Sequence, residues 1–442
     1  MSKIFYGSLY GDGLYFLPRI IKEGKQTLTY IDDKWYKKLY EGMIPKRASM
    51  TMWESEITKN DTVVFDYNFT KGVESYLRLK ARGVHNIIGG SPFAYALEHD
   101  RAFCMRLFAQ NGINIPETVV CKNNAQGIAF IKKNEGKWVY KPNGEDTGSE
   151  ETYCAETGKD MLDWIQSRPD QEFILQKFVE DGVCEVGISI YFSRGNPMNP
   201  PAHCIELKRY GTGNWGQNTG CMSSVCWYDD DLYDNPTIKE TWDKLFHIFK
   251  EEEFTGQCDI SGIVTKDGTF YALEATPGRF GYSQDLGFYQ LLTEPISMLW
   301  EYMARGDGVK IECDKTAYGF EARGSVPPYP LEQKKGFEKE TQKLIFHSRN
   351  TPIVFKPHEN ITYDWVDVKK SKNSEMMTAG VDAIICEVGT KDKDILGAQK
   401  RVLAAMQDIK MGGLYCRTDP FEGAAKEIEI LKKLGFWSNS HL

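Results

Sequence analysis

Short apolar runs alternate with amphipathic stretches through the first hundred residues, and glycine turns join them. Strands are predicted at 3–5, 27–31, 61–66 and 86–88, and helices at 14–21 and 72–82. Strands that alternate with helices are typical of a parallel, doubly wound sheet. We therefore expect the chain to begin with an α/β layer.

The middle of the chain changes pattern. A helix is predicted over 94–110, and strands at 118–121, 138–141, 173–177 and 184–192 surround a helix near 160–167. That arrangement indicates a small α+β lobe. A helix over 237–252 then leads into strands at 256–264 and 269–274, which the turn Lys266-Asp267-Gly268 joins as a hairpin.

The last third starts with a helix near 289–305, after which Asp307-Gly308 marks a break. Short strands and two helices follow, so we expect a separate, strand-rich domain. With 442 residues the chain exceeds the roughly 250–300 residues of a single core. The predicted fold class is a multidomain α/β and α+β protein, with domains at 1–96, 97–306 (small lobe near 118–180) and 307–442.

The composition of the chain argues against several classes of protein. No apolar run approaches the ~20 residues of a membrane span, and the start resembles a strand rather than a signal peptide, so we expect a cytoplasmic protein without membrane contact. Eleven cysteines show no metal or disulfide spacing. The net charge of -8 is spread along the sequence without a Lys/Arg cluster, which argues against a nucleic-acid surface.

Several polar residues could carry chemistry. Lys141 ends an apolar strand and precedes a polar loop at 142–149, where a lysine can meet phosphate oxygens. Asp259 and Glu274 lie on the two predicted hairpin strands, and pairing could put both carboxylates on one face, as a Mg²⁺ site needs. Taken singly, a solvated lysine and a solvated acidic face remain the alternatives.

Two further groups of residues could bind a carboxylate or phosphate. Arg279 emerges from a loop at 275–282, and arginine suits bidentate contact with a carboxylate or phosphate. Lys208-Arg209 precede a glycine-containing stretch at 216–220, whose backbone N–H groups could approach a ligand, or which could be a surface loop. No nucleophile elbow, histidine metal cluster or GxxxxGK[ST] motif occurs.

Taken in order, these segments resemble the ATP-grasp superfamily, and within it phosphoribosylamine–glycine ligase. Leu97 to Phe103 is similar to the family's "LExSKAF" helix entry, with Arg101 in place of lysine. Lys208-Arg209 and Asn218 to Met222 are similar to "HKR" and "NTGGM" at the same spacing. The stretch 273–281 is similar to "LEFNxRFGDPE", and 397–419 to the final helix and "YRxDIG".

The resemblance implies roles for these residues. It implies ATP and Mg²⁺ (or Mn²⁺) as ligands, with Asp259 and Glu274 on the metal. Lys208, Arg209, Asn218 and Arg279 would hold the carboxylate substrate. Nucleotide contacts would come from Arg101, Lys141, Gln176, Lys177, Phe178, Val179 and Glu185.

Departures from the family fall where its amine substrate binds. Residues 7–14 replace "GxGGREHA", and 66–70 replace "GPExPL". Ser149 stands for a lysine of the phosphate loop, Thr276 for a metal-binding asparagine, and 282–284 for "DPE". These changes affect the amine site more than the nucleotide site.

The resemblance implies an ADP-forming ligase that joins glycine or another small amino acid to an amine through an acyl-phosphate, in nucleotide or modified-nucleotide metabolism. A true phosphoribosylamine–glycine ligase of purine biosynthesis is one alternative. A kinase and a regulatory protein that binds ATP without turnover are the others. The partners of the ligase would be its substrates, a small carboxylate and an amine.

Overall fold

The computed structural model describes residues 2–45, 47–145, 151–233, 235–278, 285–308, 310–327 and 348–436. The chain begins with a parallel four-stranded sheet in the order β2-β1-β3-β4. Its strands are β1 (Ile4–Ser8), β2 (Thr27–Ile31), β3 (Thr62–Phe65) and β4 (Ile87–Ile88). Strands that are buried on both faces account for the continuous apolar runs. The predicted α/β layer is confirmed.

Helices cover this sheet, and some were not predicted. The helix α1 (Phe16–Lys22) and the helix α3 (Thr70–Ala81) match the prediction. The 3₁₀ helix η1 (Lys34–Lys38) and the helix α2 (Met50–Glu56) lie where no element was predicted. Asp33 and Ser49 cap these two short helices by accepting backbone N–H groups, which is a local signal for a helix start.

The single helix predicted over 94–110 is wrong, because the chain forms two helices there. They are α4 (Pro92–His99) and α5 (Arg101–Gln110). Asp100 between them has non-helical φ and ψ of -99° and 84°, and its carboxylate accepts the N–H of Phe103 at 2.8 Å. Asp100 thus starts a new helix, with Arg101 at its first position.

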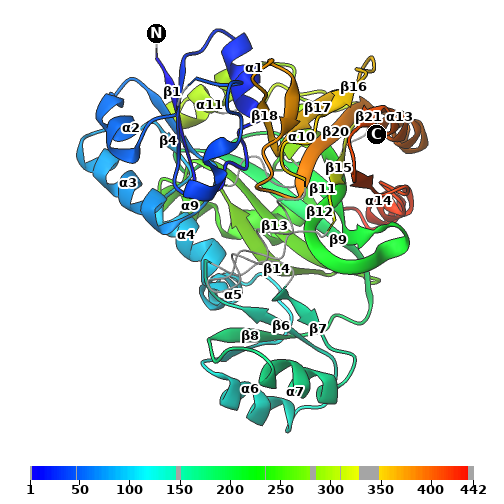
Figure 1. Ribbon diagram of the computed structural model, residues 1–442. Coiled ribbons are helices and arrows are strands. Elements are labelled where there is room, and N and C mark those ends of the chain that lie inside the picture. Colours follow the sequence, from blue (N-terminus) through cyan, green and yellow to red (C-terminus); the bar gives the residue numbers. More distant parts are fainter. Residues whose placement is uncertain are drawn as a thin grey trace.

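The small lobe is a four-stranded antiparallel sheet in the order β5-β8-β6-β7. It projects from the rest of the chain, with both of its helices on one face (Figure 1). Its elements are β5 (Thr118–Cys121), α6 (Asn124–Ile131), β6 (Trp138–Pro142), β7 (Tyr153–Cys154), α7 (Gly158–Gln166) and β8 (Phe173–Lys177). A separate apolar core holds the lobe together.

A large sheet forms the centre of the molecule, and ten strands belong to it in the described residues. The strands that carry the site are β9 (Gly182–Ser193), β11 (Ala202–Gly211), β12 (Trp215–Tyr228), β13 (Gly256–Thr265) and β14 (Phe270–Pro277). β10 (Asn196–Pro197) pairs with β9. The predicted hairpin of β13 and β14 is present. The stretch 216–220, for which a surface loop was an alternative, instead belongs to the strand β12.

Strands from the last third continue the same sheet through β15 (Tyr318–Ser325), β20 (Ile384–Asp392), β17 (Thr362–Trp365) and β22 (Tyr415–Cys416). Two small antiparallel pairs are β16 (Val354–Phe355) with β21 (Ile409–Lys410), and β18 (Val368–Lys370) with β19 (Met376–Thr378). The helices α13 (Ile395–Gln407) and α14 (Ala424–Lys433) complete this part. The domain boundaries at 96 and 306 stay predictions.

Two other predicted helices are broken. The stretch 237–252 forms α8 (Pro236–Glu240), the 3₁₀ helix η4 (Trp242–Lys244) and α9 (Phe246–Glu251). Near 289–305 the chain forms α10 (Asp285–Tyr289) and α11 (Ile296–Arg305). In the described part of the chain, every helix is too short or too polar to cross a membrane.

Candidate active site

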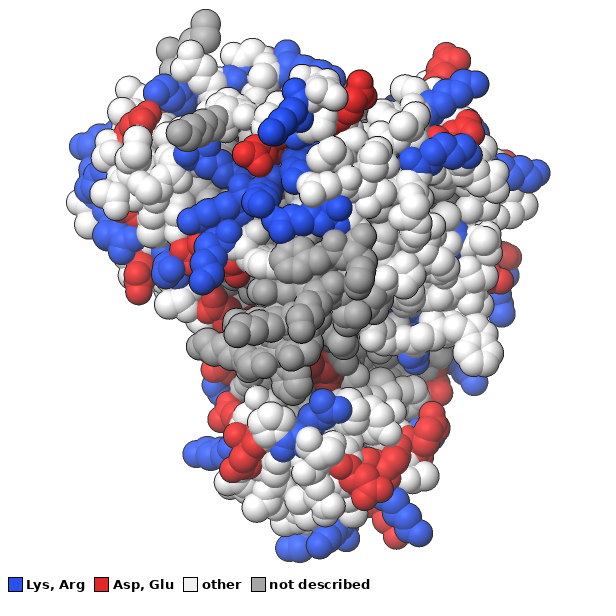
Figure 2. Space-filling model, viewed as in Figure 1, with Lys and Arg blue, Asp and Glu red and all other residues white. Residues whose placement is uncertain are grey.

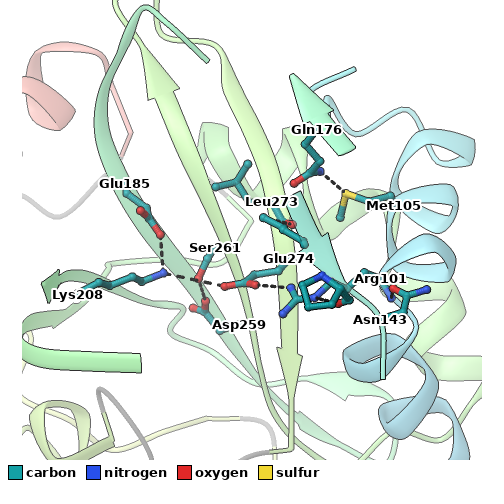
Figure 3. Close-up of polar contacts among 12 residues, drawn as sticks. Arg101, Met105, Asn143, Gln176, Glu185, Lys208, Asp259, Ser261, Leu273 and Glu274 are labelled. Carbon is teal, nitrogen blue, oxygen red and sulfur yellow. Dashed lines mark hydrogen bonds and ion pairs between the residues drawn. The ribbon is translucent and has the colours of Figure 1, made fainter. Parts of the chain in front are cut away.

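The hairpin of β13 and β14 places two carboxylates on one face of the large sheet. Ser261 lies opposite Glu274, and Asp259 lies opposite Thr276. Because side chains two residues apart on a strand share a face, Asp259 and Glu274 are diagonal neighbours. This arrangement agrees with the pairing predicted from the sequence, and Figure 3 shows the two side chains close together.

Asp259 is buried and held by two hydroxyl groups. Ser189 Oγ donates to Asp259 Oδ1 and Ser261 Oγ donates to Oδ2, each at 2.7 Å. Burial raises the pKa of Asp259 above its ordinary value, although both hydroxyls and the Lys208 ammonium favour the ionised form. Asp259 thus presents carboxylate oxygens in a fixed orientation on the face of the sheet that carries the site.

Glu274 is surrounded by three cations from three elements. Arg101 at the start of α5 pairs with Glu274 Oε2 at 3.0 Å, and Lys208 on β11 lies 4.0 Å from Oε1. Burial favours the neutral carboxyl, yet Lys141, Lys208 and Arg101 hold the pKa of Glu274 well below its ordinary range. Glu274 therefore stays ionised through the neutral pH range.

Lys141 brings the small lobe into the site. It lies on β6 with 6% of its surface exposed, and its ammonium donates to Leu273 O on β14 at 3.4 Å. Burial lowers the pKa of Lys141, while the attraction of Glu274 opposes that shift. The strand-end lysine of the sequence analysis thus lies inside the site rather than in solvent.

Lys208 links three carboxylates. Its ammonium lies 2.5 Å from Glu185 Oε1 on β9 and 3.7 Å from Glu206 Oε2. Burial disfavours the charged form, but Glu185, Glu206 and Glu274 together raise the pKa of Lys208 well above its ordinary value. Figure 3 shows Glu185, Lys208, Glu274 and Arg101 as a row of alternating charge, called here the charged row.

Glu206 is a charged residue of this group that the sequence pattern did not predict. It lies two residues before Lys208 on the same strand, so both side chains share a face. The alternation of polar residues at 206 and 208 would have identified the pair if this stretch had been assigned as a strand. The glycines at 211, 213 and 216, which directly follow this stretch, interrupt the alternation of polar and apolar residues that would predict a strand.

Arg209 and Asn218 lie closer to the tip of the hairpin of β11 and β12, opposite each other. The Arg209 guanidinium donates to Gly216 O at 2.9 Å, and no described carboxylate forms an ion pair with it. The structure therefore brings Lys208 to the charged row but leaves Arg209 outside it.

The residues expected to contact the adenine follow the end of β8. Gln176 is 1% exposed; its amide nitrogen donates to Thr118 Oγ1 at 3.2 Å and contacts Met105 Sδ at 3.1 Å. Among the described residues, no group donates a hydrogen bond to its Oε1. Lys177 is exposed and pairs with Glu117 at 3.8 Å, and Phe178 is 37% exposed. The chain passes through Val179 into β9.

Arg279 and Ser149 lie outside the described residues. The segment just before Arg279 contacts the loop that follows β3, because Asn68 Nδ2 donates to Pro277 O at 2.6 Å. Gly89 and Gly278 meet beside it with φ of 70° and 64°. A Cβ on Gly89 would lie 2.5 Å from Phe65 O, so glycine is required there.

Comparison with known proteins identifies the fold. The sequence matches no family model and no curated protein. Solved structures of ATP-grasp enzymes superpose on nearly the whole chain, so the chain has the ATP-grasp fold.

One of these structures is phosphoribosylamine–glycine ligase from Thermotoga maritima, with 15% identity, a TM-score of 0.72, and coverage of 95% of this chain and 100% of that chain. Biotin carboxylase from Campylobacter jejuni, in complex with an ATP analogue, gives 13% identity, a TM-score of 0.64, and coverage of 98% and 95%. A third structure is the biotin carboxylase domain of the Hydrogenobacter thermophilus 2-oxoglutarate carboxylase, in complex with MgADP and bicarbonate. It has 12% identity, a TM-score of 0.65, and coverage of 94% of this chain and 91% of that chain.

Proposed function

We propose that this chain is an ATP-dependent ligase that joins a small carboxylate to an amine and forms ADP. One observation carries the proposal: Arg101, Lys141 and Lys208 converge on Glu274 from three separate elements. Three cations around one ionised carboxylate suit a polyphosphate with a divalent cation. The ATP-grasp fold supports the same reading.

ATP would bind where the small lobe meets the large sheet. Lys177, Phe178 and Val179 would contact the adenine, and Glu185 the ribose. The unpartnered Gln176 Oε1 fits this assignment, since a buried acceptor without a donor suits the exocyclic amino group of a base. Lys141 and Arg101 would hold the phosphates.

Asp259 and Glu274 fit a magnesium site. They are carboxylates on one sheet face beside the cations, and Mg²⁺ commonly takes one or two carboxylates together with substrate phosphates. Asp259 and Glu274 would hold such an ion, which would supply positive charge beside the phosphates. Neighbouring residues orient the two carboxylates. Ser189 and Ser261 donate hydrogen bonds to Asp259, and Arg101 donates one to Glu274.

In the proposed reaction the carboxylate oxygen attacks the γ-phosphorus, giving an acyl-phosphate and ADP. The amine then attacks the activated carbonyl and releases phosphate. Lys208, Arg209, Asn218 and Arg279 are the proposed carboxylate contacts. The small lobe would act as a lid that excludes water, which protects the acyl-phosphate from hydrolysis.

We propose glycine or another small amino acid as the carboxylate, and nucleotide or modified-nucleotide metabolism as the setting. The likeness to phosphoribosylamine–glycine ligase favours that same activity as the second candidate. Against it, the residues at 7–14 that replace the family's amine-binding loop differ in charge and size.

The test is ADP release with Mg-ATP and a panel of amino acids, glycine first, with hydroxylamine added to trap the acyl-phosphate as a hydroxamate. We expect hydroxamate with one amino acid and none without ATP. ADP formation with a stable phosphorylated product and no hydroxamate would instead show a kinase. ATP binding without ADP would show a non-catalytic protein.

A further inference from the structure

The four residues that follow Lys141, at 142–145, bond to helices outside the small lobe. Pro142 and Asn143 both accept hydrogen bonds from Arg101. The Arg101 Nε donates to Pro142 O at 3.0 Å, and its backbone N–H donates to Asn143 Oδ1 at 3.1 Å. Figure 3 shows Asn143 beside Arg101. The end of β6 is thus bound to the start of α5.

The next two residues continue these contacts. Gly144 N donates to His99 O at 3.0 Å. Glu145 Oε2 accepts hydrogen bonds from Thr70 Oγ1 at 2.6 Å and from Tyr95 Oη at 2.9 Å. Thr70 is the first residue of α3, and Tyr95 and His99 belong to α4. The segment after β6 is therefore bound to three helices that lie outside the lobe.

Glu145 also completes the start of α3. The N-cap residue Phe69 has no polar side-chain atom, so the first N–H groups of α3 receive no cap from it. The Thr70 N–H donates to the Glu145 carboxylate, at 3.3 Å to Oε2 and 3.4 Å to Oε1. The helix dipole favours a carboxylate at this end of a helix. A residue from a distant loop thus supplies the cap that the local sequence lacks.

A general attraction between charged surfaces does not account for the position of the small lobe. On the face shown in Figure 2, Lys and Arg side chains are mixed with Asp and Glu over the described part of the lobe. A surface of mixed sign exerts little net pull on its neighbours, and salt screens what remains. The specific hydrogen bonds at 142–145 therefore hold this edge of the lobe.

These contacts bear on Lys141, because it directly precedes the anchored residues. Lys141 is 6% exposed, and its ammonium reaches Leu273 O at 3.4 Å, which is a long hydrogen bond. It shares the Glu274 carboxylate with two other cations, Arg101 and Lys208. Holding a buried ammonium in such a place costs free energy. An anchor on the residues that follow keeps the ammonium from moving towards solvent.

We propose that Glu145 is a positioning residue that acts through Lys141. By bonding to Thr70 and Tyr95 it holds the end of β6 against α3 and α4, and so keeps the Lys141 ammonium beside Glu274. That this ammonium then receives the phosphates of ATP rests on the function proposed above. The position of Lys141 itself does not depend on that function.

The first test is labelling of the nucleotide-free protein with an amine-reactive reagent, with the modified lysines measured by mass spectrometry. Glu145→Ala should raise the labelling rate of Lys141 roughly fivefold or more, because losing hydrogen bonds to a charged group makes local opening easier. Glu145→Gln keeps an acceptor oxygen and should give a smaller increase. Glu135→Ala, at an exposed position of the same lobe, is the control and should label as the wild type does.

The second test is calorimetric titration with Mg²⁺ and β,γ-imido-ATP, a non-hydrolysable analogue. Glu145→Ala should weaken binding about five- to tenfold, since only the molecules with Lys141 in place are ready to bind. In the ADP-release assay the KM for ATP should rise more than kcat falls, because bound phosphates themselves hold the ammonium. Tyr95→Phe should weaken binding less, and adding it to Glu145→Ala should cause little further loss.

Equal labelling of Lys141 in the wild type and in Glu145→Ala would overturn the proposal. Faster labelling with unchanged affinity for the analogue would overturn the positioning role, and additive losses from Tyr95→Phe and Glu145→Ala would show that the two residues do not act together. Absence of analogue binding by the wild type would reject the proposed function. The labelling rates would then still decide whether Glu145 holds Lys141 in place.

Discussion

Glu274 stabilises three cations that would otherwise repel one another. Arg101, Lys141 and Lys208 come from α5, β6 and β11, so the carboxylate also links the small lobe to the large sheet. A neutral amide at this position keeps the shape of the side chain and removes the charge. That substitution separates the electrostatic role of Glu274 from its packing.

Glu274→Gln is predicted to lower ADP formation by about a hundredfold or more, since one preorganised charged group at a phosphoryl-transfer site typically contributes that much. The readout is the initial rate of ADP release with Mg-ATP and the active amino acid. Circular dichroism should show a folded protein. Glu251→Gln, at an exposed position of α9, is the control and should keep full activity. Full activity of Glu274→Gln would remove Glu274 from the site.

At the scale of elements, the hairpin of β11 and β12 depends on the segment after β22. Arg417 is 2% exposed and donates to Arg209 O at 2.7 Å and to Asn214 Oδ1 at 3.0 Å. It also pairs with Asp419 at 2.8 Å, and Asp419 accepts the N–H of Gly213 at 2.7 Å. This segment therefore holds the hairpin tip, near the proposed carboxylate contacts Arg209 and Asn218.

Arg417→Ala is predicted to destabilise the protein by about 3 kcal/mol, because it removes a buried guanidinium that donates to two acceptors of the hairpin tip and pairs with Asp419. Faster hydrogen exchange at 209–218 should accompany it, together with a higher KM for the carboxylate. Urea unfolding and exchange mass spectrometry measure both effects. Arg78→Ala removes an exposed pair with Glu54 and should cost under about 1 kcal/mol. Unchanged exchange at the hairpin tip would contradict the role of Arg417.

Across the whole molecule, several buried carboxyl groups resist ionisation. Burial raises the pKa of Asp367 to about 7, although the N–H groups of Gly380 and Val381 donate to it at 2.9 and 3.1 Å. Burial and the neighbouring Glu185 raise the pKa of Glu427 to about 7. The folded chain keeps protons on such groups that the unfolded chain releases above about pH 4.

Stability is therefore predicted to fall as the pH rises from about 4 to about 7. Asp367 should account for roughly 1–3 kcal/mol of this fall. Asp367→Asn, which cannot ionise, should flatten the pH dependence of the unfolding free energy over that window. Thermal or urea unfolding at pH 5 and pH 8 tests this, with Asp163→Asn on the exposed face of α7 as the control. An equal slope in wild type and Asp367→Asn would reject the assignment.

Local patterns identified those elements whose signals lie within a few residues. The parallel strands, the hairpin of β13 and β14 and the strand β6 that carries Lys141 were predicted, because apolar runs, turn residues and strand alternation are encoded locally. The helix breaks were not predicted. Asp100 starts a second helix in the middle of the stretch predicted as one helix, and the stretch 237–252 divides into three short helices. The hairpin of β11 and β12 was missed because glycines interrupt its alternation.

The sequence by itself determined the class of fold and which residue types carry charge at each strand and turn. Only the tertiary structure decided which of them meet. Lys208 joins Glu274 while its neighbour Arg209 does not, and η1 is followed by a segment that bonds to β18 from the other end of the chain. The physical reason is that strand pairing and packing between distant segments set these distances, and no local propensity encodes them.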